Sequence, residues 1–99
     1  MANYIPEEIL KPFLHSYEGG NVWQVHSGDR WLTVWLYSNE QIEINKDLPI
    51  YQEMREEYFK LVDKYLDLKL SSSKAISLYF ESKENFDTKY RSSWQFYYT

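Results

Sequence analysis

Residues 86–98 alternate between two sets of side chains, and this period of two constrains the fold more than any other feature of the chain. One set is mostly aromatic: Phe86, Thr88, Tyr90, Ser92, Trp94, Phe96 and Tyr98. The other set is mostly polar: Asp87, Lys89, Arg91, Ser93, Gln95 and Tyr97. Because successive side chains of a strand point to opposite faces, the pattern predicts one long strand at the end of the sequence. We expect its removal to expose a hydrophobic face.

The first predicted element is a helix. Pro6 suits a first helical position, and apolar residues recur at helical spacing over 9–17. Pro12 removes a backbone hydrogen bond, so we expect a kinked or split helix that ends at Gly19-Gly20.

A β-hairpin follows, with strands over 22–26 and 30–37 and a tight turn centred on Gly28 and Asp29. The register set by this turn gives one apolar face, made of Trp23, Val25, Leu32, Val34 and Leu36. The other face carries Val22, Gln24, His26, Trp31, Thr33, Trp35 and Tyr37.

A short third strand over 41–45 is expected to turn Ile42 and Ile44 inward. A long helix over 49–68 follows, with Asp47 expected as its cap. Its apolar side is predicted from Ile50, Met54, Tyr58, Leu61, Val62, Tyr65 and Leu68.

The helix is expected to end at the serine run 71–73, followed by a strand over 75–81 and a connection over 82–85 to the terminal strand. The predicted order is α-β-β-(β)-α-β-β, in which hairpins replace βαβ crossovers. The fold class is therefore α+β, a single domain over residues 1–99 whose antiparallel sheet has four to five strands and both helices on one face.

Composition favours a cytoplasmic protein. The chain has no cysteine, no basic leader and no apolar run long enough to span a bilayer. Charge is uneven: residues 1–57 carry ten acidic and four basic side chains, a balance of −6, and residues 58–99 carry five and seven, a balance of +2. Such an acidic half steers basic partners and repels nucleic acid.

We expect no catalytic activity, no metal and no cofactor. His26, Ser27 and Asp29 sit together in the hairpin, yet adjacent strand residues diverge and cannot form a triad. Two histidines without cysteine do not build a closed zinc site. Glu56 and Glu57 point about 100° apart on a helix, so they are no catalytic pair.

Trp31, Trp35 and Tyr37 share the sheet face away from the expected core. They are either covered by a loop, the N-terminus or a second subunit, or they form an aromatic contact surface for a protein. Such a face also stacks nucleic-acid bases, a runner-up function that would use Lys89 and Arg91 as the phosphate-binding cations.

The densest acidity lies between residues 40 and 57, on either a solvated face or a surface for a basic partner. The predicted partner-binding residues are Trp31, Trp35, Tyr37, Glu40, Glu43, Glu53, Glu56 and Glu57.

Residues 48–90 resemble the C-terminal part of small bacterial immunity proteins, which neutralise polymorphic or contact-dependent toxins. The resemblance rests on the helix over 49–68, the strand over 76–81 and a second strand over 85–90. It implies a non-enzymatic antitoxin that binds a toxin domain, commonly a nuclease, and blocks its active site or substrate path. An acidic, aromatic-rich domain suits that role, because a nuclease must be basic to hold its substrate.

Overall fold

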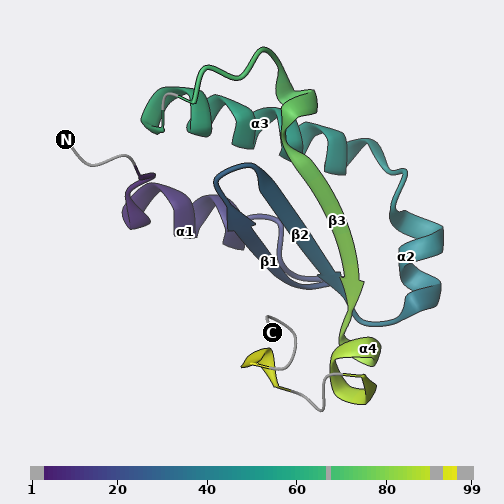
Figure 1. Ribbon diagram of the computed structural model, residues 1–99. Helices are drawn as coiled ribbons and strands as arrows, with labels where there is room; N and C mark the ends of the chain where they lie inside the picture. Colours follow the sequence, from purple (N-terminus) through teal and green to yellow (C-terminus); the bar gives the residue numbers. More distant parts are fainter. Residues whose placement is uncertain (1–3, 67, 90–92, 96–99) are drawn as a thin grey trace.

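The computed structural model describes residues 4–66, 68–89 and 93–95, and shows a three-stranded sheet surrounded by helices (Figure 1). The elements in chain order are α1 (Glu7–His15), β1 (Val22–Gly28), β2 (Trp31–Leu36), α2 (Asn39–Asn45), α3 (Pro49–Tyr65), the 3-10 turn η1 (Ser73–Ala75), β3 (Ser77–Ser82) and α4 (Lys83–Thr88). The predicted α+β class is confirmed.

The sheet differs from the prediction in strand number and direction. Its order is β1-β2-β3, with β1 antiparallel and β3 parallel to the central strand β2. Parallel neighbours need a long crossover connection, which α2 and α3 supply between β2 and β3. The prediction of a wholly antiparallel sheet of four to five strands is therefore not confirmed.

The hairpin turn is one residue later than predicted. Gly28 pairs with Trp31, so Asp29 and Arg30 form the turn. Residues 24–28 are consequently paired two positions further along β2 than predicted, and Val25 pairs with Val34. A shift of two positions keeps each of these side chains on its predicted face. Gly28 is needed for space: a Cβ there would lie 2.1 Å from Nε1 of Trp31.

A bulge in β1 changes the predicted faces at the start of the hairpin. Val22 pairs with Leu36 and Gln24 pairs with Trp35, which leaves Trp23 as the extra residue. Val22 consequently joins the core, whereas Trp23 contacts the ring of Trp35 on the opposite face. The prediction that Trp23 belongs to the core face is wrong.

Both long helices, α1 and α3, pack on the same face of the sheet, as predicted. The buried core on this face consists of Ile5, Val22, Val25, Leu32, Val34, Leu36, Tyr51, Met54, Tyr58, Val62, Leu66 and Ile76. The Tyr58 hydroxyl donates a hydrogen bond to the carbonyl of Gly28 and so ties α3 to the hairpin.

The two long helices differ from the prediction at their ends. Of the predicted alternatives, kinked or split, the split one is wrong, because α1 is one helix that contains Pro12. It ends at His15, so the predicted end at Gly19-Gly20 is wrong too. α3 begins at Pro49 as predicted and ends at Tyr65. Its N-cap residue is Leu48 rather than Asp47.

Residues 39–45 form the helix α2 instead of the predicted short strand. Ser38 and Gln41 form a capping box: the Ser38 hydroxyl accepts from the Gln41 N–H, and the Gln41 side chain accepts from the Ser38 N–H, each at 3.2 Å. Ile42 packs against the core, but Ile44 is 67% exposed, so its predicted inward position is wrong.

The predicted terminal strand is wrong where it can be compared. Residues 83–88 form α4, whose N-cap Ser82 accepts a hydrogen bond from the Asn85 N–H at 3.0 Å. Trp94 and Gln95 are also helical. The other parts of the predicted strand, residues 90–92 and 96–98, lie outside the described residues.

We predict that Trp35→Ala lowers the free energy of unfolding by about 3–5 kcal/mol, because its ring is fully buried. Tyr79 is the matched control: it projects from β3 on the same face and is 54% exposed. Tyr79→Ala should cost less than about 1 kcal/mol. Urea denaturation measures both variants, and equal losses would contradict the burial of Trp35.

Candidate functional site

The second face of the sheet carries an aromatic cluster formed by Trp23, Trp35, Phe86 and Trp94. Trp35 lies in its centre, with the Trp94 ring 5.0 Å away and nearly perpendicular. Phe86 from α4 lies 4.1 Å from Trp94, and Trp23 stacks on Trp94 at 5.7 Å. Trp35 is therefore covered from within the chain, by α4 and residues 93–95.

His26 borders the aromatic cluster, 4.7 Å from the Trp94 ring and 5.9 Å from the Trp35 ring. Its Nε2 shares a hydrogen bond with the Gln24 side chain at 2.9 Å. Burial lowers the pKa of His26, and the nearby Glu18 carboxylate partly offsets that effect. Glu18 also accepts a hydrogen bond from the Val25 N–H at 3.1 Å, so it closes part of the outer edge of β1.

The three aromatic residues predicted to bind a partner have different environments. Trp35 has no exposed surface. Trp31 is half-buried, with its ring beside Gly28. Tyr37 is 44% exposed at the end of β2. Tyr37 and part of Trp31 are therefore accessible from outside, whereas Trp35 acts in packing.

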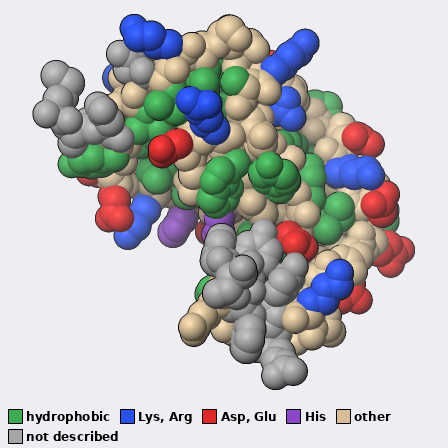
Figure 2. Space-filling model, in the orientation of Figure 1, with side chains coloured by type: hydrophobic (Ala, Val, Ile, Leu, Met, Phe, Trp, Pro, Cys, Tyr) green, Lys and Arg blue, Asp and Glu red, His purple; other side chains and the backbone are tan. Residues whose placement is uncertain are grey.

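The five predicted acidic residues lie on two consecutive helices. Glu40 and Glu43 are exposed on α2, where acidic side chains gather around a basic one at the right of Figure 2. Glu53 and Glu56 are exposed on α3, and Glu57 is half-buried there. Burial, together with the charges of Glu53 and Glu57, raises the pKa of Tyr17, which indicates that these two acids lie on the side of α3 near Tyr17.

Two of these acids are paired with cations. Glu43 lies 3.1 Å from Lys46 and Glu57 lies 3.1 Å from Lys60. These pairs are largely exposed and contribute little to stability. Within the described residues, Glu40 and Glu53 form no ion pair, so their charges remain available to a partner.

Exposed apolar side chains lie between the two groups of acids in the sequence. Ile44 at the end of α2, Leu48 before α3 and Ile50 in its first turn are 67%, 44% and 47% exposed. Sequence reasoning assigned Ile44 and Ile50 to the core and missed this feature. The capping-box pattern Ser38-x-x-Gln41 was the available signal, because it predicts a helix instead of a strand. In a helix, Ile44 no longer lies on the same side as Ile42.

We call this region the α2–α3 surface. It consists of Tyr37, Glu40, Glu43, Ile44, Leu48, Ile50, Glu53, Glu56 and Glu57. Its mixture of accessible apolar groups and carboxylates is suited to bind a protein whose contact region contains Lys or Arg.

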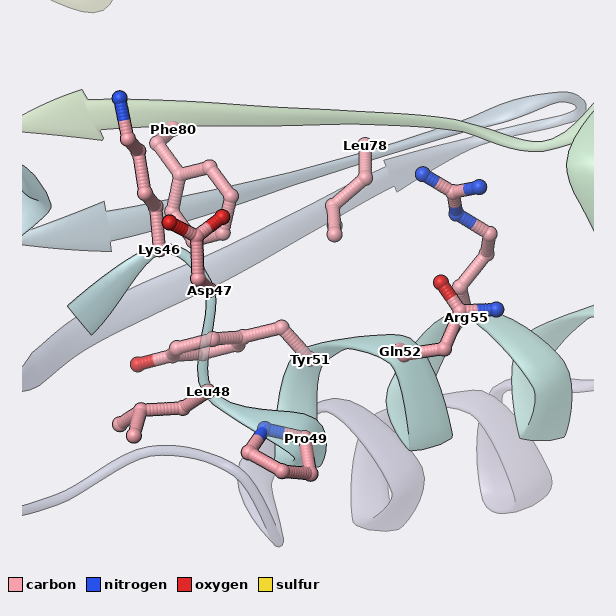
Figure 3. Close-up of a pocket in the computed structure, with 9 residues that line it drawn as sticks. All are labelled: Lys46, Asp47, Leu48, Pro49, Tyr51, Gln52, Arg55, Leu78 and Phe80. Carbon is pink, nitrogen blue, oxygen red and sulfur yellow. The ribbon is translucent and has the colours of Figure 1, made fainter.

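A separate cavity of about 310 Å³ lies between β3 and α3 (Figure 3). Leu78 and Phe80 project into it from β3, and Tyr51, Gln52 and Arg55 line it from α3. Residues 46–49 close one end. We call this cavity the β3–α3 groove.

Among residues 4–66, 68–89 and 93–95, no three His, Cys, Asp or Glu side chains come together as metal ligands. In the same part of the chain, no helix has both the length and the apolar composition needed to cross a membrane.

Comparison with protein-family models, curated proteins and solved structures found no match. The resemblance to immunity proteins thus stays a prediction. Of its structural elements, the long helix and the strand after it are present, whereas the expected second strand over 85–90 is replaced by α4 up to Thr88.

We predict that His26 makes stability depend on pH. Its folded pKa lies below the unfolded value of about 6.5, so the unfolded chain binds more protons between the two values. The free energy of unfolding should therefore fall as pH decreases from about 7 towards the lowered pKa of His26. His26→Asn should flatten this part of the profile in denaturant titrations, and an unchanged slope would contradict the assignment.

Proposed function

We propose that this protein is a non-enzymatic binding protein that inhibits a basic toxin domain of the nuclease type, as an immunity protein does. The observation that carries the proposal is the α2–α3 surface, where carboxylates flank accessible apolar side chains. A nuclease needs a basic groove to hold its substrate, and an acidic surface with an apolar centre is complementary to such a groove.

Charge and contact have separate roles in this proposal. The acids increase the rate of encounter with a basic partner, whereas Ile44, Leu48 and Ile50 exclude water once the complex has formed. The chain acts in the cytoplasm, where it meets the toxin domain before nucleic acid is cleaved.

The buried position of Trp35 favours this proposal over the runner-up, a nucleic-acid-binding module. Base stacking requires an accessible ring, and the ring of Trp35 is fully buried. Of the cations invoked for that function, Lys89 is exposed, and Arg91 lies outside the described residues. We expect no binding of single-stranded RNA or DNA at about micromolar affinity and physiological salt.

We expect the gene next to the one for this chain to encode the toxin domain, and the test is protection of growing cells from that domain. Cells that express both proteins should survive, and cells that express the toxin domain alone should die. Purified complex should form more slowly as salt rises, because ions screen charge over about 8 Å at physiological ionic strength. Tight binding of an oligonucleotide, with no protection from the toxin, would overturn the proposal.

We predict that replacing Glu53, Glu56 and Glu57 together with Gln keeps the fold and abolishes protection. Each exposed charge contributes within about 0.5 kcal/mol to stability, but close charge pairs across an interface are coupled by roughly 1.5 kcal/mol or more. The control is Glu7→Gln with Glu8→Gln, two exposed acids of α1. Protection by the triple variant at the level of the control would show that the α3 acids are only a solvated face.

A further inference from the structure

β3 is an edge strand with unused backbone groups. The Ser77 N–H donates to the Arg30 carbonyl at 2.8 Å, which sets the phase of the parallel ladder. Alternate residues of a strand direct their backbone N–H and C=O groups to the same neighbour. The backbone groups of Tyr79 therefore also point to β2, whereas those of Leu78 and Phe80 point to the free edge. Within the described residues these edge groups have no hydrogen-bond partner.

The β3–α3 groove lies directly beside this edge. Leu78 and Phe80 provide the apolar wall on the strand side, and Tyr51, whose ring lies 5.1 Å from that of Phe80, provides the wall on the helix side. A volume of about 310 Å³ is at the lower end of ligand pockets, which range from about 300 to 1,000 Å³. The groove therefore has room for side chains rather than for a large cofactor.

Arg55 gives the groove a cation without a counterion. Its side chain rises from α3 towards β3 in Figure 3, and its Nε atom is buried without a hydrogen-bond partner. No ion pair involves Arg55 in the described part of the chain, although its guanidinium is always charged. A buried donor of this kind is stabilised by a carboxylate that reaches it.

The other charges of the groove lie at its opposite end. Lys46 and Asp47 lie there, away from Arg55 in Figure 3, and Lys46 forms an ion pair with Glu43 at 3.1 Å. One cation and two carboxylates leave this end with a net charge of −1. An incoming acid is therefore attracted to the Arg55 end.

We propose that the β3–α3 groove binds an extended segment of another protein, which adds to the free edge of β3 as a fourth strand and places an acidic side chain against Arg55. Adjacent strands lie about 4.8 Å apart, and residues i and i+2 of a strand point to the same face. An added strand therefore delivers a second, apolar side chain against Leu78, Phe80 and Tyr51. Leu78 and Phe80 supply two donors and two acceptors for its backbone.

This inference is independent of the inhibitor proposal. The groove selects an acidic segment, whereas the α2–α3 surface selects a basic one. The two regions share Leu48, so the proposals are tested at residues that belong to one region only: Glu53 and Glu57 for the α2–α3 surface and Arg55 for the groove.

The first experiment selects binders from a library of random seven-residue peptides displayed in extended form on a carrier. Enriched peptides should share an acidic residue two positions from an apolar one. Arg55→Gln should weaken their binding about tenfold or more, because a charge-assisted hydrogen bond is lost. The matched control is Arg30→Gln, which changes an exposed arginine in the hairpin turn and should leave affinity unchanged. Absence of enriched peptides, or equal affinity for both variants, would overturn the proposal.

The second experiment tests strand addition on the unaltered protein. Each residue of a selected peptide is N-methylated in turn. Methylation should abolish binding at every second residue and leave binding intact at the residues between them. On binding, the amides of Leu78 and Phe80 should gain protection from hydrogen exchange, whereas those of Ser77 and Tyr79 are already bonded to β2. Binding that tolerates N-methylation at every position, or that leaves the Leu78 and Phe80 amides unprotected, would refute addition to the edge.

Discussion

The burial of β2 on both of its faces is the constraint on which the rest of the structure depends. Leu32, Val34 and Leu36 face the helices α1 and α3, and Thr33 and Trp35 face the opposite side, where α4 lies. No residue of 32–36 is more than 4% exposed. Because one strand needs cover on both sides, a chain of this length must place helices above and below its small sheet.

The parallel pairing of β2 and β3 determines where the short helices begin. The carboxyl ends of both strands lie next to each other, so α2 and α4 start side by side. The Ser82 hydroxyl donates to the Asn39 side chain at 2.7 Å, and the Asn39 N–H donates to Glu84 at 3.0 Å. This network directs α4 under the second face of the sheet, where Phe86 meets Trp35. Much of the aromatic content therefore serves packing.

The two proposed binding regions use different sides of α3. Glu53 and Glu57 lie on the side near Tyr17, whereas Arg55 and Gln52 line the groove beside β3. Consecutive helical residues differ in direction by about 100°, so a single helix carries exposed acids on one side and a half-buried arginine on another. A net charge of −4 describes neither surface, since it averages over both.

The sequence by itself determined the elements whose signals are local. Pro49 and the apolar spacing after it predicted α3, the alternation in 31–36 predicted β2 and its two faces, and the exposure of Glu40 and Glu53 followed from their charge. Only the tertiary structure decided what covers Trp35, because Phe86 and Trp94 are distant in the chain, and their alternating pattern also fits a strand. In residues 83–88, the Ser82 cap and the burial of Phe86 against Trp35 stabilise a helix. Such packing outweighs the local preference for a strand. The direction of β3 and the charge of the groove were likewise set by the fold, since Arg55 and Leu78 meet only after α3 has crossed back over the sheet.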